Sequence, residues 1–262
     1  MTWFESVILG IVQGATEFLP VSSSGHLVMA QELLAVRIPG VLFEVAVHVA
    51  TLVSILLVYR TRVGELVVGV VKGDREALTY AGLIVVATIP AGLLGVFGKD
   101  AIERLFDNPW APGFALLVTG TFLWSSRAVL EKADAPRPTW AAAFLIGIAQ
   151  AFALVPGISR SGATVVAALW MGVEAREAAA FSFLMALPAI AGAAVLQIPD
   201  LGGAEAAALA PGVVLAGSVA AGVTGVLAIR TFNAMLARRS FHFFAPYCWA
   251  VGALYLAYLT LG

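Results

Sequence analysis

Two short polar runs interrupt a chain that is otherwise almost continuously apolar. They lie at residues 17–26 (EFLPVSSSGH, the first polar run) and 156–164 (PGISRSGAT, the second polar run). Charged side chains at membrane depth are rare and usually functional. The Pro and Gly residues beside them break a helix, which is tolerated only where protein covers the backbone or water fills a cavity. A carboxylate, an imidazole, a guanidinium and several hydroxyls there indicate a site for an anionic, phosphate-bearing ligand.

The composition indicates a membrane protein. Hydrophobic residues make up 61% of the 262 residues and charged residues 12%, whereas a soluble domain has about 25% charged residues. The net charge of −1 gives no reason to expect a nucleic acid partner. The one cysteine, Cys248, excludes a disulfide framework within the chain and a cysteine-based metal site. No Lys or Arg precedes the first apolar stretch, so we expect no cleavable signal peptide.

Apolar segments of about 20 residues predict membrane-spanning helices. Two apolar stretches, about 3–35 and 139–173, contain the polar runs and break in the middle, so neither half of either stretch can span alone. The predicted fold class is an all-α integral membrane protein, one domain over residues 1–262, with six transmembrane helices and two re-entrant helical hairpins. The six predicted spans are 41–59, 78–98, 111–127, 178–198, 211–229 and 245–261.

Positive charge predicts the orientation of these segments. Loops rich in Lys and Arg remain in the cytoplasm, and such loops lie at 60–77, 128–138 and 230–244. The loops at 99–110 and 199–210 carry few or no such residues and are expected outside. This topology predicts both termini outside, and it makes the two hairpins enter from opposite faces of the bilayer.

An internal repeat supports the arrangement. Three short stretches recur, and the order hairpin, helix, Pro-containing helix is expected in both halves, about 1–127 and 139–261. Broken helices in an inverted-topology repeat are typical of many transporters, and chance similarity among Ala/Gly-rich helices is the alternative. The matched stretches are 11–13 with 148–150, 21–25 with 158–162, and 89–91 with 187–189.

Gln13 and Glu17 are candidates for holding a metal ion. They are four residues apart, so a helix places them on one face. Glu17 comes just before Pro20, where the helix should end, and a carboxylate there opposes the helix dipole. This position favours a metal or proton-transfer role, because Mg²⁺ typically binds one or two carboxylates, waters and phosphate oxygens. A water-exposed glutamate at a hairpin tip is the alternative.

Ser23 and His26 are three residues apart and can face the same way at the start of a helix. A hydroxyl beside an imidazole forms a nucleophile-and-base pair, and histidine exchanges a proton near neutral pH. One serine of the triplet 22–24 is expected to serve only as a helix N-cap. A hydrogen-bonded core histidine is the alternative for His26.

Arg160 is the strongest candidate for phosphate binding. Its planar guanidinium matches phosphate oxygens bidentately, and the helix starting near Ser161 adds N–H donors at its N-terminus. An intramembrane ion pair with Glu17 is the alternative, and it does not exclude function.

Other polar residues carry weaker expectations. Glu44 and His48 are four apart, and they either support the site or form a structural pair on one helix face. Arg176 and Glu177 are expected to be solvated interfacial charges, and Ser182 is expected to line the site.

At the two polar runs the chain resembles the undecaprenyl-diphosphatase family, also known for bacitracin resistance. Residues 13–17 (QGATE) and 20–26 (PVSSSGH) match the pattern Glu or Gln, three residues, Glu, then Pro-x-Ser-Ser-x-Gly-His. Residues 156–164 complete the pattern Pro-Gly-x-Ser-Arg-Ser-x-x-Thr. Gln13 stands where some members have Glu, and Tyr247 is followed by Cys-Trp where many members soon have Arg. The resemblance runs the whole length.

The resemblance implies hydrolysis of a C55 polyprenyl diphosphate, with a divalent cation (Mg²⁺ or Ca²⁺), in the bacterial cytoplasmic (inner) membrane. Residues and resemblance together predict Glu17, Ser23, His26 and Arg160 as catalytic, with Glu17 also binding the metal. The expected partners are the polyprenyl diphosphate lipid, the bilayer and a possible homodimer. The predicted substrate-binding residues are Gln13, Ser22, Gly157, Ser159, Ser161, Gly162 and Thr164.

A transporter or flippase of polyprenyl phosphate is the main alternative, because inverted repeats with broken helices suit it equally. A structural scaffold would leave Glu17, His26 and Arg160 unexplained.

Overall fold

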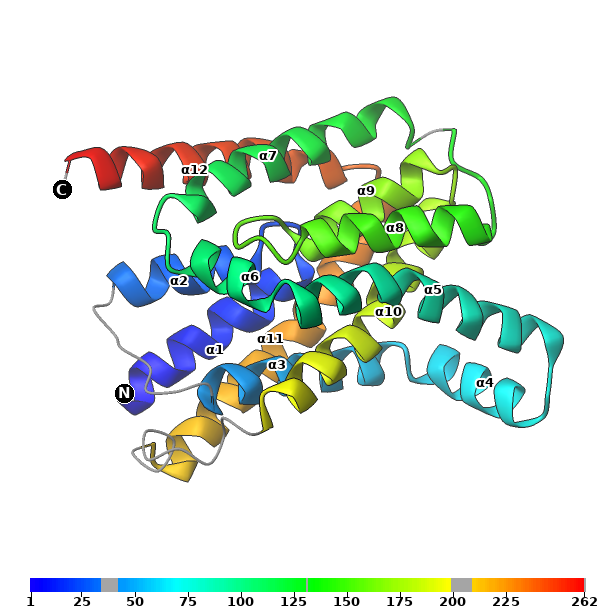
Figure 1. Ribbon diagram of the computed structural model, residues 1–262, viewed down its shortest axis with the longest axis horizontal. Helices are drawn as coiled ribbons and strands as arrows, with labels where there is room; N and C mark the ends of the chain where they lie inside the picture. Colours follow the sequence, from blue (N-terminus) through cyan, green and yellow to red (C-terminus); the bar gives the residue numbers. More distant parts are fainter. Residues whose placement is uncertain (34–41, 131, 199–208, 262) are drawn as a thin grey trace.

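The computed structural model describes residues 1–33, 42–130, 132–198 and 209–261, and nearly all regular structure in these ranges is helical (Figure 1). One isolated backbone bridge joins Ala135 to Val173. Short 3₁₀ turns lie at Ser126–Ala128 and Phe241–Phe243. The helices are α1 Trp3–Phe18, α2 Ser23–Leu33, α3 Leu42–Val58, α4 Arg60–Val71, α5 Arg75–Phe97, α6 Lys99–Phe106, α7 Ala111–Ser125, α8 Trp140–Phe152, α9 Arg160–Trp170, α10 Ala175–Leu196, α11 Pro211–Ala237 and α12 Phe244–Leu261.

The protein is a multi-pass membrane protein. In the described part of the chain, α5, α10, α11 and the segment Phe241–Leu261 are long and apolar enough to cross a membrane. A fifth span results if α3 and α4, which meet at an 82° bend, count as one. In the predicted span 111–127 the α-helix is α7, which has 15 residues and gives way to the 3₁₀ turn at Ser126. Large apolar side chains such as Val85, Leu227 and Leu254 are exposed on the long helices, as a lipid-facing surface requires.

Two helix pairs are broken where the polar runs predict. α1 ends before Pro20, its C-cap Leu19 being extended, because the residue before a proline avoids the helical region. α8 ends at Phe152, and α9 begins at Arg160. We name residues 19–22 the first break and residues 153–159 the second break. In each pair the two short helices pack against each other.

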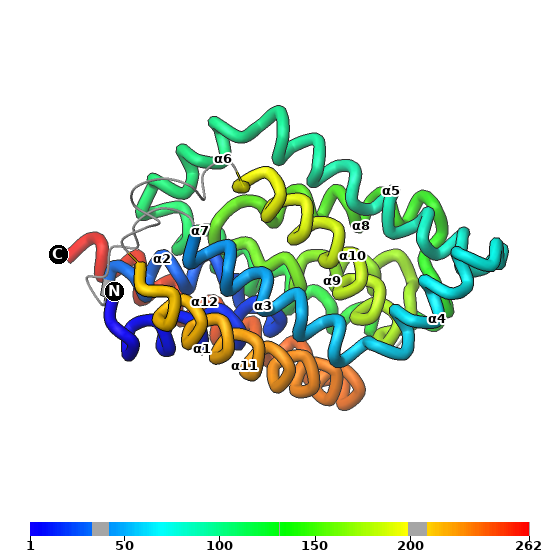
Figure 2. Tube along the Cα trace, turned by 90° about the horizontal axis from the view of Figure 1, so that it is seen from below, coloured from blue at the N-terminus to red at the C-terminus, as the bar shows by residue number. Residues whose placement is uncertain are grey.

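The broken pairs are held by helices from the opposite half of the chain. α1 packs along α11, and α8 packs along α5 (Figures 1 and 2). A Cβ atom added to Gly10 would lie 2.2 Å from the carbonyl oxygen of Gly217, and one added to Gly147 would lie 2.4 Å from that of Ala87. Positions 10 and 147 have the offset that relates 22 to 159 (147 − 10 = 159 − 22 = 137). Two glycines that this offset relates therefore make similar close contacts with the backbone of a neighbouring helix.

The expected order of helices around the matched stretches 89–91 and 187–189 is wrong for the second half. Pro90 lies inside α5, which follows the first broken pair only after α3 and α4. Pro188 lies inside α10, the helix directly after the second broken pair. The expected order of hairpin, helix and Pro-containing helix holds in the first half alone, because the similarity covers only three residues.

A chain of buried aromatic rings packs beneath the first break. Phe18, the last residue of α1, meets Phe183 of α10 edge-to-face with ring centroids 5.6 Å apart. Phe183 meets Phe232 of α11 at 5.2 Å, and Phe232 meets Phe241 at 5.3 Å. Edge-to-face packing is the preferred arrangement of such rings, so this row fixes the end of α1 that carries Glu17.

The close contact of α1 with α11 predicts an asymmetric response to two glycine substitutions. Gly10→Ala should destabilise the protein by about 1–3 kcal/mol, because the added methyl group meets backbone that cannot rotate away. Gly92→Ala in α5 is the matched control, since a Cβ there meets nothing within 4 Å. Melting temperatures in detergent measure both. If Gly10→Ala melts no lower than Gly92→Ala, the contact is wrong.

Candidate active site

The two breaks meet, as the sequence predicts. The Ser22 hydroxyl oxygen accepts hydrogen bonds from the N–H of Gly157, at 3.1 Å, and from the N–H of Gly25, at 3.4 Å. The Ser161 hydroxyl donates to the carbonyl of Leu19 at 3.3 Å. Ser22 has a φ of 70°, a conformation that non-glycine residues adopt only where their surroundings hold them. The contact between the halves supplies that support.

Two serines at equivalent positions cap the inner helices. The Ser159 hydroxyl accepts from the N–H of Gly162 at 3.1 Å and so caps α9. Ser22, the residue before α2, accepts the corresponding bond from the N–H of Gly25. The expected capping role therefore falls on Ser22, not on Ser23. Both helices begin beside the meeting point of the breaks, and helix N-termini favour anions.

The second break depends on one glycine and on a threonine that we did not predict. Gly157 has a φ of 100°, and a Cβ there would lie 2.5 Å from the Pro112 carbonyl oxygen. The Thr119 hydroxyl of α7 donates to the Gly157 carbonyl at 2.8 Å and accepts from the N–H of Ser159 at 3.1 Å. A single threonine in an apolar helix gives no signal of this role in the sequence.

Glu17 lies at the centre of the site, and its side chain is almost fully buried. An Arg160 nitrogen lies 2.7 Å from its Oε1. The Gln13 amide nitrogen and the Ser23 hydroxyl donate to its Oε2, at 3.0 Å and 2.5 Å. The guanidinium offsets the carboxylate charge at a depth where an unpaired charge would be costly. The two polar runs are thus joined through an ion pair, the contact expected as the alternative for Arg160.

The expected pairing of Ser23 with His26 is wrong, since the structure gives each side chain another partner. α2 begins at Ser23, whose hydroxyl turns back to Glu17 at the end of α1. His26 Nδ1 lies 2.8 Å from the carbonyl oxygen of Ser22, and its Nε2 lies 2.8 Å from the hydroxyl of Tyr247. A carboxylate, not an imidazole, is therefore in place to accept the Ser23 proton.

Two predicted site residues turn into the packing between helices instead. The Thr164 hydroxyl donates to the Arg160 carbonyl at 2.7 Å and lies 2.6 Å from the hydroxyl of Ser182. Ser182 therefore ties α10 to α9, and the structure gives no contact of either side chain with Glu17 among the described residues. Thr164 acts on the site only by fixing the helix that begins with Arg160.

His48 lies beside the site. Its Nε2 is 3.9 Å from Glu17 Oε2, and its Nδ1 is 2.7 Å from the carbonyl oxygen of Glu44. The Glu44 side chain accepts from Gln31 at 3.3 Å. Glu44 and His48 were expected either to support the site or to form a structural pair, and the position of His48 fits the first expectation. The i, i+4 spacing within an apolar helix was the signal in the sequence.

The expectation of a solvated Glu177 is wrong. Its side chain is buried, with Arg62 nitrogen to carboxylate distances of 2.9 and 3.0 Å and a hydrogen bond from the Tyr80 hydroxyl at 2.6 Å. The bend between α3 and α4 brings Arg62 across to α10, which spacing along the chain does not reveal. Arg176 is exposed, as expected.

The donor atoms at Glu17 fit a hard divalent cation. The Oε1 atom of Gln13 is buried without a hydrogen-bond partner, next to the carboxylate that the same side chain contacts. Both are oxygen donors, which Mg²⁺ and Ca²⁺ prefer. Over the described ranges, no group of three or more His, Cys, Asp or Glu could hold a metal ion. The residues fit a cation that takes its remaining ligands from water and from phosphate.

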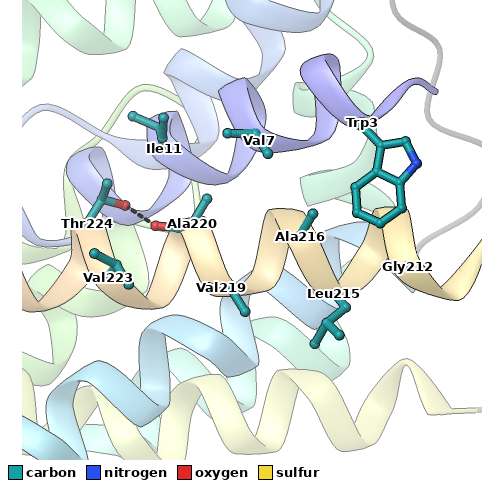
Figure 3. Close-up of a pocket in the computed structure, with 10 residues that line it drawn as sticks. All are labelled: Trp3, Val7, Ile11, Gly212, Leu215, Ala216, Val219, Ala220, Val223 and Thr224. Atoms are coloured by element: carbon teal, nitrogen blue, oxygen red, sulfur yellow. Dashed lines mark hydrogen bonds between the residues drawn. The ribbon is translucent and has the colours of Figure 1, made fainter.

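A surface groove between α1 and α11, about 580 Å³ in volume, lies apart from this chemistry. Figure 3 shows its lining, with Trp3 and Leu215 at one end and Ile11 and Thr224 at the other. The Thr224 hydroxyl donates to the carbonyl of Ala220 in its own helix at 2.7 Å. The groove contains none of the predicted site residues, and its apolar lining suits contact with lipid.

Fold and site together define a multi-pass membrane protein with a buried charged centre between two broken helices. The family model described as bacitracin resistance protein BacA matches residues 6–254, and the chain belongs to this family. The undecaprenyl-diphosphatase of Desulfatibacillum aliphaticivorans is 40% identical over 275 residues, covering 98% of each chain. The proteins of the same name from Alkaliphilus metalliredigens and Methanobrevibacter smithii are 39% and 38% identical, with 100% coverage of both chains in the first case and 97% of this chain and 96% of the relative in the second.

Proposed function

We propose that this protein hydrolyses undecaprenyl diphosphate to undecaprenyl phosphate and inorganic phosphate, and so recycles the lipid carrier for cell-wall synthesis. The observation that carries the proposal is the meeting of Glu17 and Arg160 at 2.7 Å in a membrane protein of this family. Phosphoryl transfer needs positioning and charge neutralisation more than covalent help. A guanidinium, a carboxylate with oxygen-donor neighbours and two helix N-termini supply both.

The finer architecture is part of the proposal. We infer six crossing helices and two re-entrant pairs in an inverted repeat, with both termini outside the bacterial cytoplasmic membrane. The packing of α1 on α11 and of α8 on α5, each a helix of the opposite half, supports the repeat. The loop 199–210, whose lack of Lys and Arg contributed to this topology, lies mostly outside the described residues.

Arg160 and the start of α9 are proposed to bind the terminal phosphate. The guanidinium now contacts Glu17, so an entering diphosphate must share it or take it over. The N-terminus of α9, which begins at Arg160, adds backbone N–H donors near Ser161 for the same oxygens. The prenyl tail would lie between helices or in lipid, where apolar walls oppose it least.

Glu17, with the free oxygen of Gln13, is proposed to hold the divalent cation. When bound, the cation would neutralise charge on the phosphate oxygens. Glu17 also accepts a hydrogen bond from the Ser23 hydroxyl, with 2.5 Å between the two oxygens. It is therefore placed to take a proton from Ser23, if that oxygen attacks phosphorus, or from a water that Ser23 positions. His26 is proposed to handle the proton of the leaving or attacking group.

The transporter alternative gains no support from the comparisons, since the curated relatives quoted above are named diphosphatases. A direct assay separates the two functions. Purified protein in detergent should release inorganic phosphate from undecaprenyl diphosphate when Mg²⁺ or Ca²⁺ is present, and chelation should abolish the release. A transporter would release none, and release that survives chelation would remove the cation from the proposal.

The charged and imidazole groups at the site should each be needed for turnover. Glu17→Ala, His26→Ala and Arg160→Ala are expected to lower kcat/KM by about 10²-fold or more, the scale for loss of a positioned acid–base or electrostatic group. Arg176→Ala, at an exposed arginine, is the control. Gel filtration and melting curves check that each variant folds. Near-normal turnover in folded Arg160→Ala would overturn the site assignment.

Ser23 gives a separate test of the nucleophile. Because its hydroxyl contacts Glu17 directly, we expect Ser23→Ala to lose about 10²-fold or more in kcat. Ser24→Ala is the matched control, since the Ser24 hydroxyl contacts Ser22, at 3.3 Å, and not Glu17 in the described structure. Substantial activity in Ser23→Ala would reject a phosphoserine intermediate and leave water as the attacking group.

A further inference from the structure

The hydrogen bonds of His26 define its tautomer. Nδ1 lies 2.8 Å from the carbonyl oxygen of Ser22, which can only accept, so Nδ1 carries a hydrogen. In the neutral ring Nε2 then holds the lone pair. The group at that lone pair is the hydroxyl of Tyr247, at 2.8 Å, which must donate to it.

Tyr247 reaches His26 from a helix that is fixed in place. It lies in the first turn of α12, next to Cys248, whose thiol is 3.6 Å from the Pro20 carbonyl of the first break. Trp249 donates from its indole nitrogen to the Leu117 carbonyl of α7 at 3.2 Å. The planes of the His26 and Tyr247 rings lie within 8° of parallel. The hydroxyl is therefore presented to the imidazole by packing on both sides of its helix.

We propose that Tyr247 is a positioning residue that keeps His26 hydrogen-bonded in both of its protonation states. The inference rests on the proposed role of His26 in proton transfer. A hydroxyl can donate or accept. It donates to the lone pair of neutral His26, and its oxygen accepts from the N–H after Nε2 has taken a proton along the same hydrogen bond. A carbonyl or an amide N–H could serve only one of these states.

This arrangement sets the direction of proton exchange. The Ser22 carbonyl occupies Nδ1 in both states, so a proton reaches the ring only at Nε2, through the Tyr247 hydroxyl. The hydroxyl gives its hydrogen to Nε2 while its oxygen takes one from a water or substrate group on its other side, and the reverse transfer releases the proton. Tyr247 and His26 are both partly accessible at this edge, so the site can exchange a proton there without exposing Glu17. Tyr247 contacts neither Glu17 nor Arg160 in the described structure, which distinguishes its role from that of the charged residues.

The variant Tyr247→Phe tests the hydroxyl while keeping the ring. We expect kcat to fall about tenfold, the scale of one hydrogen bond to a group that becomes charged, with KM little changed. Tyr258→Phe, in the same helix and exposed, is the control. Wild-type kcat in Tyr247→Phe would overturn the proposal, and so would a fall confined to KM.

A spectroscopic measurement makes the test independent of turnover. The chain has three histidines, His26, His48 and His242, so ¹⁵N NMR of histidine-labelled protein can be assigned with His26→Gln. Wild type should show hydrogen on Nδ1 of His26 and a hydrogen-bonded acceptor at Nε2, and Tyr247→Phe should move the Nε2 signal downfield. Hydrogen on Nε2 of the neutral ring, or an unchanged signal in the variant, would reject the inference. Absence of phosphate release by wild type would instead reject the proposed function.

Discussion

The buried ion pair of Glu17 with Arg160 is the constraint on which the rest of the site depends. Each charge alone would be costly away from water, so the first polar run requires the second. Gln13 and Ser23 occupy the other carboxylate oxygen, and this hydrogen-bonded set holds Glu17 in one orientation. Folding and function therefore depend on the same contact, since a phosphate must compete with Glu17 for the Arg160 guanidinium.

The breaks in the helices put these groups within reach of one another. A continuous helix would leave no free N–H groups at this depth, whereas two breaks leave two helix starts. Ser22 and Ser159 satisfy one donor in each by the same type of bond. Gly157 allows the approach of the second break to α7, and Thr119 fixes it there. The two broken helix pairs thus provide a similar frame, and the charged residues that differ between them supply the chemistry.

Much of this could be predicted from the sequence because the signals are local. The helices, the breaks and the shared face of Gln13 and Glu17 follow from hydropathy, Pro and Gly positions and helical spacing. The partners of individual side chains do not. Ser23 turns to Glu17, and Tyr247, 221 residues from His26, completes the imidazole bonds. Such contacts depend on rotamers and on the packing of distant helices. The prediction of a solvated Glu177 was wrong for the same reason. Its partner Arg62 lies close to it because of the bend between α3 and α4, which the composition does not indicate.

The crossed packing of α1 on α11 and of α8 on α5 has a consequence for biosynthesis. About two hundred residues separate α1 from α11, the helix on which it packs. During synthesis α1 therefore reaches the bilayer long before α11 is translated. Until then its glycine-lined face and its acidic end must be tolerated by lipid, by water or by the insertion machinery. The dependence is one-sided in time, because α5, the partner of the second broken pair, has already been made when α8 appears, whereas the first broken pair waits for α11.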